Sequence, residues 1–516
     1  MRPQISKIIY CLFFAVFLFF AAQLLIYHWH IIVYPYPLEY REPAIIISTD
    51  YMLKGQNPYS FSSQPVYINT YGFLYNLVNL PFARLFGVNF FVHRFISAVF
   101  LLLSCALVFW IMRCQKKGGL FKFLAVLVLY TGFLYFVTPL ARPDGLGIFL
   151  FLSSIAVVYL CNYSWPSITM GMLLGICAFN TKAYFLLGSL YVVLYLFLFV
   201  SKRKGIMACL VLCIVLALSL ILVQYHSDCY FNNTILSHWG ADKETNLGIH
   251  FSMIQFRAFF GYYIASVLAF FLAGVMVFIG FLKSERGNLD KSLIDFRKMD
   301  MPFLRFRCDL FLFCLICSLG IVYFKLGTYP GNYRTYLFQL ILPFLLIVMN
   351  GWLVNVKNDS VFVCLLIIDL CGLTPKRLLN ESFLRMEEKR KPWQRLEQLI
   401  AENQLILNTP IIAHWLKDKN VYDTGLTGYF IKSVNRSSFF KSWYPPVSMI
   451  EEKHNLFLDD VSQKLERKEY DFIMINDLDY LGILMMNKIK KYYSYQESLF
   501  IEMPWERIWV HIWKPR

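Results

Sequence analysis

The chain has 516 residues, of which 58% are hydrophobic and only 16% are charged. Soluble domains carry about 25% charged residues, so the composition excludes a single water-soluble core and indicates membrane-spanning helices. The net charge of +16 does not indicate a nucleic-acid partner, because the basic residues stand between the apolar runs, as the positive-inside rule describes.

The apolar runs predict a helix bundle with about eleven membrane spans, since about 20 apolar residues cross the hydrocarbon core. The first run, Ile8 to Ile26, follows Arg2 and Lys7 and lacks a clear small-residue cleavage site, so we expect a retained first span. The predicted spans cover residues 8–29, 92–112, 121–138, 146–162, 167–181, 183–200, 206–224, 260–282, 309–325, 336–354 and 360–374.

Lysine and arginine predict which loops face the cytoplasm. With the N-terminus inside, the basic stretches 113–117, 202–204 and 283–307 are cytoplasmic, and the remaining loops are poorer in basic residues. An odd number of spans then places the C-terminal tail on the outer side of the plasma (inner) membrane. In the first outer loop, residues 33–91, the apolar spacing indicates short amphipathic helices along the membrane surface.

The tail, residues 376–516, alternates helical and strand patterns, whereas residues 1–375 form the membrane module. We expect a helix over Trp393 to Asn403. Strands are expected over Leu405 to Ala413, Tyr470 to Ile475 and Arg507 to Trp513. The predicted fold class is therefore mainly α, a polytopic membrane helix bundle with a small extracytoplasmic α/β domain.

Two acids follow the first span directly. Glu39 and Glu42 are three residues apart, so they share one face if this stretch is helical. Two carboxylates at a membrane boundary can supply a general base and a supporting acid. An ordinary solvated loop, with Arg41 as an ion partner, is the alternative.

Charged residues also occupy two short outer connections. Arg142 and Asp144 lie between the third and fourth spans, and Lys182 lies between two adjoining spans. Charges at a membrane edge are costly and are therefore functional candidates. An Arg142–Asp144 ion pair, or a Lys182 side chain that extends to the interface, would also account for them.

A third outer connection follows the ninth span. Residues 327–331 predict a tight turn, and the polar residues after it are candidates for ligand binding: Asn332, Tyr333 and Arg334. A structural turn with interfacial aromatic residues is the alternative. Because all these groups fall on one predicted side of the membrane, Arg142, Lys182 and Arg334 could together bind an anionic ligand. The phosphate of a lipid carrier fits, since its tail can stay in the bilayer.

Two further acidic features have structural explanations. Asp477 and Asp479 match the DxD pattern of metal-binding nucleotide-sugar enzymes, but such sugars are cytoplasmic and this segment is expected outside, which favours a solvated turn. Asp369 lies inside the last predicted span, and we expect it to bond to a neighbouring helix. No strong metal-ligand cluster is present, so no cofactor is predicted, and dependence on a divalent metal stays open.

Several segments of the membrane module occur in a distinctive order: Leu38 to Pro43, Leu53 to Tyr59, Tyr71 to Tyr75, Leu85 to Asn89, Ala141 to Asp144, Lys182 and Gly331 to Tyr333. Together they resemble the GT-C superfamily of membrane glycosyltransferases, which use polyprenyl-phosphate sugars. The most similar groups are the bacterial relatives of protein O-mannosyltransferases and of the lipid A aminoarabinose transferase. Many bacterial members have an Asp-Tyr-Gly-Glu-Gly loop, where this chain has Glu39 as the first acid and Arg41 and Pro43 at the glycines.

The resemblance implies an inverting hexosyl- or pentosyltransferase with an extracytoplasmic active site. It implies Glu39 as the base, with Glu42 as a support or alternative base. The other implied site residues are the donor-phosphate ligands Arg142, Lys182 and Arg334 and the substrate ligands Asp144, Tyr71, Tyr75, Asn332 and Tyr333. The implied partners are a polyprenyl-phosphate sugar donor and an envelope glycan, lipid or protein acceptor.

A secondary transporter or a lipid-linked sugar flippase is the alternative function. Such folds usually have internal repeats and ionisable groups near the bilayer midplane. The acids of this chain lie in outer loops instead, so the transferase is favoured.

Overall fold

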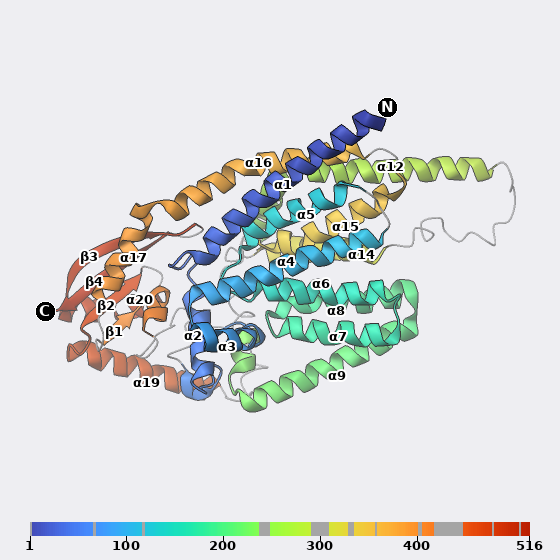
Figure 1. Ribbon diagram of the computed structural model, residues 1–516. Helices are drawn as coiled ribbons and strands as arrows, with labels where there is room; N and C mark the ends of the chain where they lie inside the picture. The colour runs from blue at the N-terminus through green and yellow to red at the C-terminus, as the bar shows by residue number, and fades with distance from the viewer. Residues whose placement is uncertain are drawn as a thin grey trace.

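Helices dominate the structure, and a small sheet lies at one end of them (Figure 1). The computed structural model describes residues 3–64, 69–115, 119–236, 248–289, 309–328, 335–356, 359–400, 405–416, 447–476, 479–504 and 507–516. The helices of the first two thirds of the chain are α1 (Pro3–Val33), α2 (Glu42–Leu53), α3 (Leu74–Phe86), α4 (Phe90–Cys114), α5 (Phe121–Gly132), α6 (Asp144–Leu160), α7 (Trp165–Phe179), α8 (Leu187–Tyr195), α9 (Lys202–His226), α11 (Gly248–Tyr262), α12 (Ile264–Leu289), α14 (Leu310–Phe324) and α15 (Leu342–Trp352).

Many of these helices are apolar enough to lie in a bilayer. Among the described residues, five segments are also long enough to cross it: Cys11–Val33, Phe90–Cys114, Ala183–Val200, Lys202–His226 and Leu310–Thr328. Shorter apolar helical segments are Phe121–Val137, Asp144–Leu160, Trp165–Phe179 and Leu337–Trp352. The chain is therefore a multi-span membrane protein, as predicted, while the total of about eleven spans stays a prediction.

A sharp bend of 88° separates α11 from α12. At the bend, Asp369 of α16 (Ser360–Arg385) accepts hydrogen bonds from the backbone N–H groups of Ala265 (3.0 Å) and Ser266 (2.7 Å). The first N–H groups of a helix have no partner inside it, so this carboxylate stabilises the start of α12. The predicted bond between Asp369 and a neighbouring helix is confirmed.

The two short helices of the first outer loop are present, but they differ in their surroundings. α3 buries one face and exposes the other, as expected of an amphipathic helix. α2 is buried on every side from Glu42 to Asp50, because it stands between the bundle and the C-terminal domain (Figure 1). The prediction of a surface helix is therefore wrong for α2.

The tail forms the predicted small α/β domain. Its elements after α16 are α17 (Glu387–Leu399), β1 (Ile406–Asn408), the 3₁₀-helix η11 (Pro410–Trp415), α19 (Val447–Glu466), β2 (Phe472–Asn476), α20 (Tyr480–Tyr492), β3 (Tyr493–Glu502) and β4 (Arg507–Pro515). The sheet order is β1-β2-β4-β3, with β1 and β2 parallel and β4 antiparallel to both of its neighbours.

The tail matches the sequence prediction in part. β2 and β4 confirm the strands expected over 470–475 and 507–513. The strand expected over 405–413 stops at Asn408, because Pro410 begins η11 and proline cannot donate to a sheet ladder. α16 continues through the predicted boundary between residues 375 and 376, so one helix joins the two parts.

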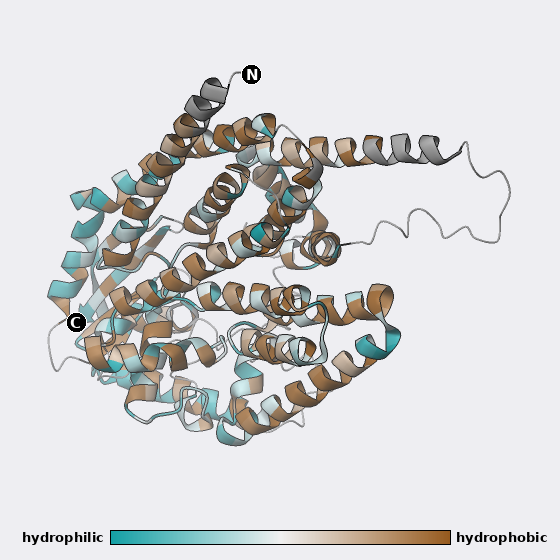
Figure 2. Ribbon diagram, turned by 45° about the vertical axis from the view of Figure 1, so that its right-hand side comes forward, coloured by the Kyte–Doolittle hydropathy of each residue, from teal (hydrophilic) through white to brown (hydrophobic). Residues whose placement is uncertain are grey.

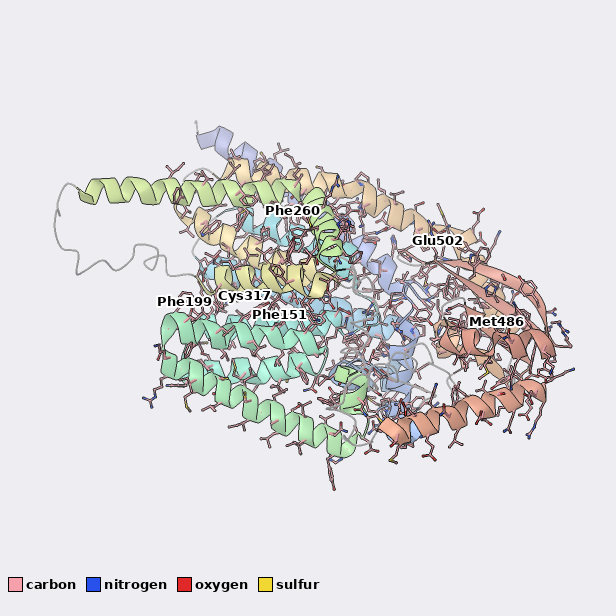
Figure 3. The ribbon with its side chains drawn as sticks, turned by 180° about the vertical axis from the view of Figure 1, so that it is seen from behind. Phe151, Phe199, Phe260, Cys317, Met486 and Glu502 are labelled. Carbon is pink, nitrogen blue, oxygen red and sulfur yellow. The ribbon has the colours of Figure 1, made fainter. Side chains whose placement is uncertain are left out.

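The polar and apolar parts of the molecule are separated along its length. Figure 2 shows apolar residues along most bundle helices and polar residues in the C-terminal domain. From behind, Figure 3 shows Phe151 and Phe199 in the bundle and Met486 and Glu502 at the other end, in the C-terminal domain. The bundle core is aromatic, since the buried ring of Phe151 contacts Phe185 and Phe344.

Candidate active site

The loop between α1 and α2, residues 34–41, carries the first candidate acid. The Oε2 atom of Glu39 accepts a hydrogen bond from the backbone N–H of Arg41 (2.9 Å). Its Oε1 atom lies 3.3 Å from Nη1 of Arg142, and the side chain is 12% exposed. Glu39 thus lies at the edge of the buried region and contacts a cation.

Glu42, three residues later, is fully buried, and each of its carboxylate oxygens accepts two hydrogen bonds. Its Oε1 accepts hydrogen bonds from Arg94 Nε (2.9 Å) and Ala141 N (2.7 Å). Its Oε2 accepts from Arg94 Nη2 and Leu38 N, both at 2.7 Å. A buried ion pair is stable only when additional hydrogen bonds satisfy it, and this pair meets that condition. We call Glu42 and Arg94 the loop anchor.

Asp144 and Lys182 form the centre of a second ionic group. Lys182 Nζ lies 2.7 Å from Oδ1 and 2.8 Å from Oδ2 of Asp144. Arg142 Nε lies 3.4 Å from Asp144 Oδ2, and Arg142 also contacts Glu39. These four residues, Glu39, Arg142, Asp144 and Lys182, are called the ionic cluster below. Two carboxylates face two cations, so the cluster is formally neutral.

Close packing of backbone explains how these distant segments meet. Gly72 N donates to Thr181 O (3.0 Å), and a Cβ atom at Gly72 would lie only 2.0 Å from Asn180 O. Only glycine permits this approach, which brings Tyr71 against the cluster. The Tyr71 hydroxyl accepts from Arg142 Nη2 (2.9 Å), and its ring lies 4.9 Å from Lys182 Nζ.

Glutamine and tyrosine side chains complete the cluster from the helix side. Gln339 Nε2 donates to Asp144 Oδ1 (2.8 Å), and Gln339 Oε1 accepts from the Tyr184 hydroxyl (2.6 Å). Both carboxylate oxygens of Asp144 therefore accept hydrogen bonds, and Asp144 fixes the position of the Lys182 ammonium.

Burial and charge act differently on the two cations. Burial lowers the pKa of Lys182 to about 8, although Asp144 opposes this shift. Burial also acts to lower the pKa of Arg142, but Glu39, Tyr71 and Asp144 outweigh it, so the pKa of Arg142 lies well above its usual value. Both side chains are therefore cationic at neutral pH.

The structure thus brings together five of the residues predicted from sequence, namely Glu39, Tyr71, Arg142, Asp144 and Lys182. It places Glu42 in the loop anchor. Tyr75 is also fully buried, and its hydroxyl donates to His93 O (2.7 Å). The predicted residues Asn332, Tyr333 and Arg334 lie outside the described residues.

Sequence reasoning missed the partners that define the two groups. Arg94 lies inside a predicted apolar span, which is a recognised signal for a functional or paired charge. Gln339 and Tyr184 likewise lie within or beside apolar runs. Within the described residues, no three His, Cys, Asp or Glu side chains lie together as potential ligands for a metal ion.

No protein-family model matches the chain, and no curated protein matches its sequence. Solved structures do match. ArnT from Cupriavidus metallidurans bound to undecaprenyl phosphate aligns over 96% of this chain and 97% of its own, with a TM-score of 0.55 and 12% sequence identity. The chain has the ArnT fold.

Other matches lie at lower TM-scores. The oligosaccharyltransferase AglB from Archaeoglobus fulgidus, in complex with an inhibitory peptide and a dolichol-phosphate, aligns over 95% of this chain and 74% of its own, with a TM-score of 0.47 and 9% identity. ArnT is a member of the GT-C superfamily. Its match therefore confirms, at the level of the fold, the resemblance predicted from the sequence.

Proposed function

We propose that this chain is an inverting glycosyltransferase that moves a sugar from a polyprenyl-phosphate donor to a hydroxyl of an envelope glycan, lipid or protein. The observation that carries the proposal is the ionic cluster, in which two carboxylates and two cations from three separate segments of the chain meet at one end of an apolar bundle. The ArnT fold supports it, since ArnT binds undecaprenyl phosphate.

In this proposal Glu39 is the general base. Its carboxylate takes the proton of the acceptor hydroxyl, and the acceptor oxygen forms a bond to the anomeric carbon. The bond between that carbon and the phosphate oxygen breaks, and its electron pair leaves with the lipid phosphate. A positioned base contributes about 10²- to 10⁴-fold to such a step.

Arg142 and Lys182 stabilise the charge of the departing phosphate. The 3.3 Å contact between Arg142 and Glu39 is longer than the Lys182–Asp144 contact and involves the more exposed side chains. We therefore expect the donor phosphate to enter between Glu39 and Arg142, which frees the Glu39 carboxylate for the acceptor. Fixed cations in a site that excludes water stabilise developing charge strongly.

Asp144, Gln339 and Tyr71 have positioning roles in this scheme, because they fix the two cations before the donor binds. Glu42 acts through the backbone, since it binds the amides of Leu38 and Ala141, which directly precede Glu39 and Arg142 in the chain. Arg334, Asn332 and Tyr333 stay predicted ligands of the donor or acceptor.

We further propose that the cluster faces the outside of the plasma membrane. The basic start of α9 and the end of α4 with Arg113 lie at the end of the bundle opposite the C-terminal domain (Figure 1). By the positive-inside rule, this arrangement supports a cytoplasmic location for that end, with the ionic cluster and the C-terminal domain outside.

The test is a transfer assay with the purified full-length chain in liposomes, supplied with radiolabelled undecaprenyl-phosphate sugars and extracted envelope glycans, lipids and proteins. The proposal predicts that label appears on one acceptor class while undecaprenyl phosphate is released. If label crosses the membrane and no glycosyl product forms with any donor, the chain is a transporter or flippase instead.

A further inference from the structure

The loop that carries Glu39 is clamped between two parts of the protein. We call residues 34–41 the base loop. On the bundle side, Arg94 donates hydrogen bonds to the carbonyl oxygens of Tyr34 and Tyr36. The contacts on its other side come from the C-terminal domain and the helix that leads into it.

Three tyrosines of the base loop make these contacts. The guanidinium of Arg390 lies 5.5 Å from the ring centroid of Tyr34. The ring of Tyr36 stacks on Trp393, with centroids 5.8 Å apart and planes 7° from parallel. The Tyr40 hydroxyl donates to Asp479 Oδ1 at 2.8 Å. Successive parts of the loop therefore contact α17 and the residue that precedes α20.

Asp479 is a rigid acceptor for Tyr40. Its side chain is buried, and its Oδ2 accepts a hydrogen bond from Asn476 N (2.8 Å) at the end of β2. Thr409, at the end of β1, donates to its Oδ1 (3.4 Å). The solvated turn expected from the sequence at Asp479 is therefore wrong, because the base loop covers this residue.

The position of Asp479 in the sheet is informative. It follows the carboxyl end of β2, beside the end of the parallel strand β1. Open α/β sheets bind their ligands beyond the carboxyl ends of parallel strands. In this protein the place is taken by Tyr40, a residue of the membrane module.

Tyr40 is also the residue next to the proposed base. Glu39 Oε2 accepts from Arg41 N, so the Glu39 side chain and the Arg41 amide close a small ring that contains the Tyr40 peptide. On one side of this ring Glu39 contacts Arg142, and on the other Tyr40 contacts Asp479. A shift of Tyr40 therefore moves the carboxylate of Glu39.

We propose that the C-terminal domain is a positioning element for catalysis, in which Asp479 acts through Tyr40 to fix Glu39 against the ionic cluster. This inference rests on the proposed function, because it assumes that Glu39 is the base. Asp479 contacts the base loop through Tyr40, so we expect donor binding to depend on Arg142 and Lys182 and not on Asp479. The domain acts on the chemical step and not on affinity for the lipid phosphate.

Two variants weaken or remove the same hydrogen bond from opposite sides. Tyr40→Phe removes the donor and keeps the ring, and Asp479→Asn keeps the shape of the acceptor but removes its charge. Glu466→Gln is the matched control, because it breaks an exposed ion pair with Lys488 elsewhere in the C-terminal domain. If Asp479→Asn destabilises the domain, Tyr40→Phe still tests the contact.

The first measurement is hydrogen exchange of peptides that cover residues 34–41 in the full-length protein, and it needs no substrate. We expect exchange to rise roughly threefold to tenfold in Tyr40→Phe and Asp479→Asn, the effect of losing one hydrogen bond, and to be unchanged in Glu466→Gln. Unchanged exchange in Tyr40→Phe would overturn the inference, whatever the activity of the protein.

The second measurement is the single-turnover rate of sugar transfer per molecule of bound undecaprenyl-phosphate sugar. Because the rate is expressed per molecule of bound donor, it does not depend on the fraction of the protein that is folded. A slower rate therefore reports a misplaced base and not a less stable protein. We expect it to fall by about tenfold or more in both variants, since misplacement by 1 Å can cost about 100-fold, while donor affinity is unchanged. The double variant should be no slower than the slower single variant.

These measurements separate the two proposals. Faster exchange with an unchanged transfer rate means that the domain holds the loop but does not position the base, which overturns the inference and leaves the transferase intact. A wild-type protein that transfers no sugar overturns the proposed function, and with it the positioning role.

Discussion

Two groups of charged side chains, the loop anchor and the ionic cluster, contain the same kinds of residue but differ in their surroundings. In the anchor, Glu42 and Arg94 are fully buried, and each oxygen of Glu42 accepts two hydrogen bonds. In the cluster, Glu39 and Arg142 are partly exposed, and their single contact is 3.3 Å long.

Glu39 and Glu42 are the same residue type, so their different surroundings explain why Glu42 has a structural role and Glu39 is the candidate base. An acid whose lone pairs are all taken by fixed donors cannot accept a proton without breaking the structure around it. Glu39 has a looser arrangement at the edge of the buried region, so a substrate can replace Arg142 there.

The largest expected change in stability follows from breaking the anchor. Glu42→Gln leaves Arg94 buried without its counter-charge, which should lower the free energy of unfolding by about 3–5 kcal/mol. Thermal unfolding in detergent would measure it. The matched control is Glu39→Gln, the same chemical change three residues away, which should keep the midpoint of the wild-type protein. Equal losses in both variants would remove the distinction between anchor and cluster.

Loss of the buried lysine should weaken donor binding. Lys182→Met removes a charged hydrogen-bond donor worth about 1.5–3 kcal/mol, so affinity for undecaprenyl phosphate should fall roughly 10- to 100-fold, as measured in lipid nanodiscs. Lys204→Met is the control, since Lys204 also lies near an aromatic ring, Trp165, but at the opposite end of the bundle. Unchanged affinity in Lys182→Met would exclude Lys182 from the phosphate site.

A smaller effect is expected from pH. Because burial lowers the pKa of Lys182 to about 8, the ammonium loses its proton as pH rises through this value, and a neutral amine does not attract a phosphate. Affinity for undecaprenyl phosphate should therefore fall above about pH 8, a range in which the phosphate, with its second pKa of about 6, is already fully ionised. Lys182→Arg should bind without this dependence, because arginine stays charged. An affinity of the wild-type protein that stays constant from about pH 7 to about pH 10 would contradict the assignment.

The smallest effect is expected at an exposed pair in the C-terminal domain. Arg395 and Glu497 lie 2.9 Å apart, with side chains 48% and 35% exposed. Arg395→Ala should change the free energy of unfolding by less than about 1 kcal/mol, because solvent screens such pairs. A loss as large as that of Glu42→Gln would show that burial does not determine how much an ion pair contributes to the free energy of unfolding.

The sequence predicted most of the fold because apolar periodicity reports directly on spans and buried strands. It also singled out the four residues that meet in the ionic cluster, since charges at a membrane edge are rare and costly. It did not separate Glu39 from Glu42, because the partner of Glu42 is 52 residues away and local spacing carries no information about it.

Other features depended on contacts that local patterns cannot report. The buried state of α2 and of Asp479 follows from the docking of the C-terminal domain onto the first outer loop. β3 was missed because its burial alternates weakly along the strand. The strand expected over 405–413 ends before Pro410, and this proline could have been used to predict the end of the strand from the sequence.

The central claim, that Glu39 is the base of a sugar transfer, is tested most directly by Glu39→Gln. With labelled undecaprenyl-phosphate sugar, the variant should bind the donor within about threefold of wild type. Its single-turnover transfer should be at least about 100-fold slower, the lower bound for loss of a general base. Wild-type transfer by a correctly folded Glu39→Gln protein would contradict the account.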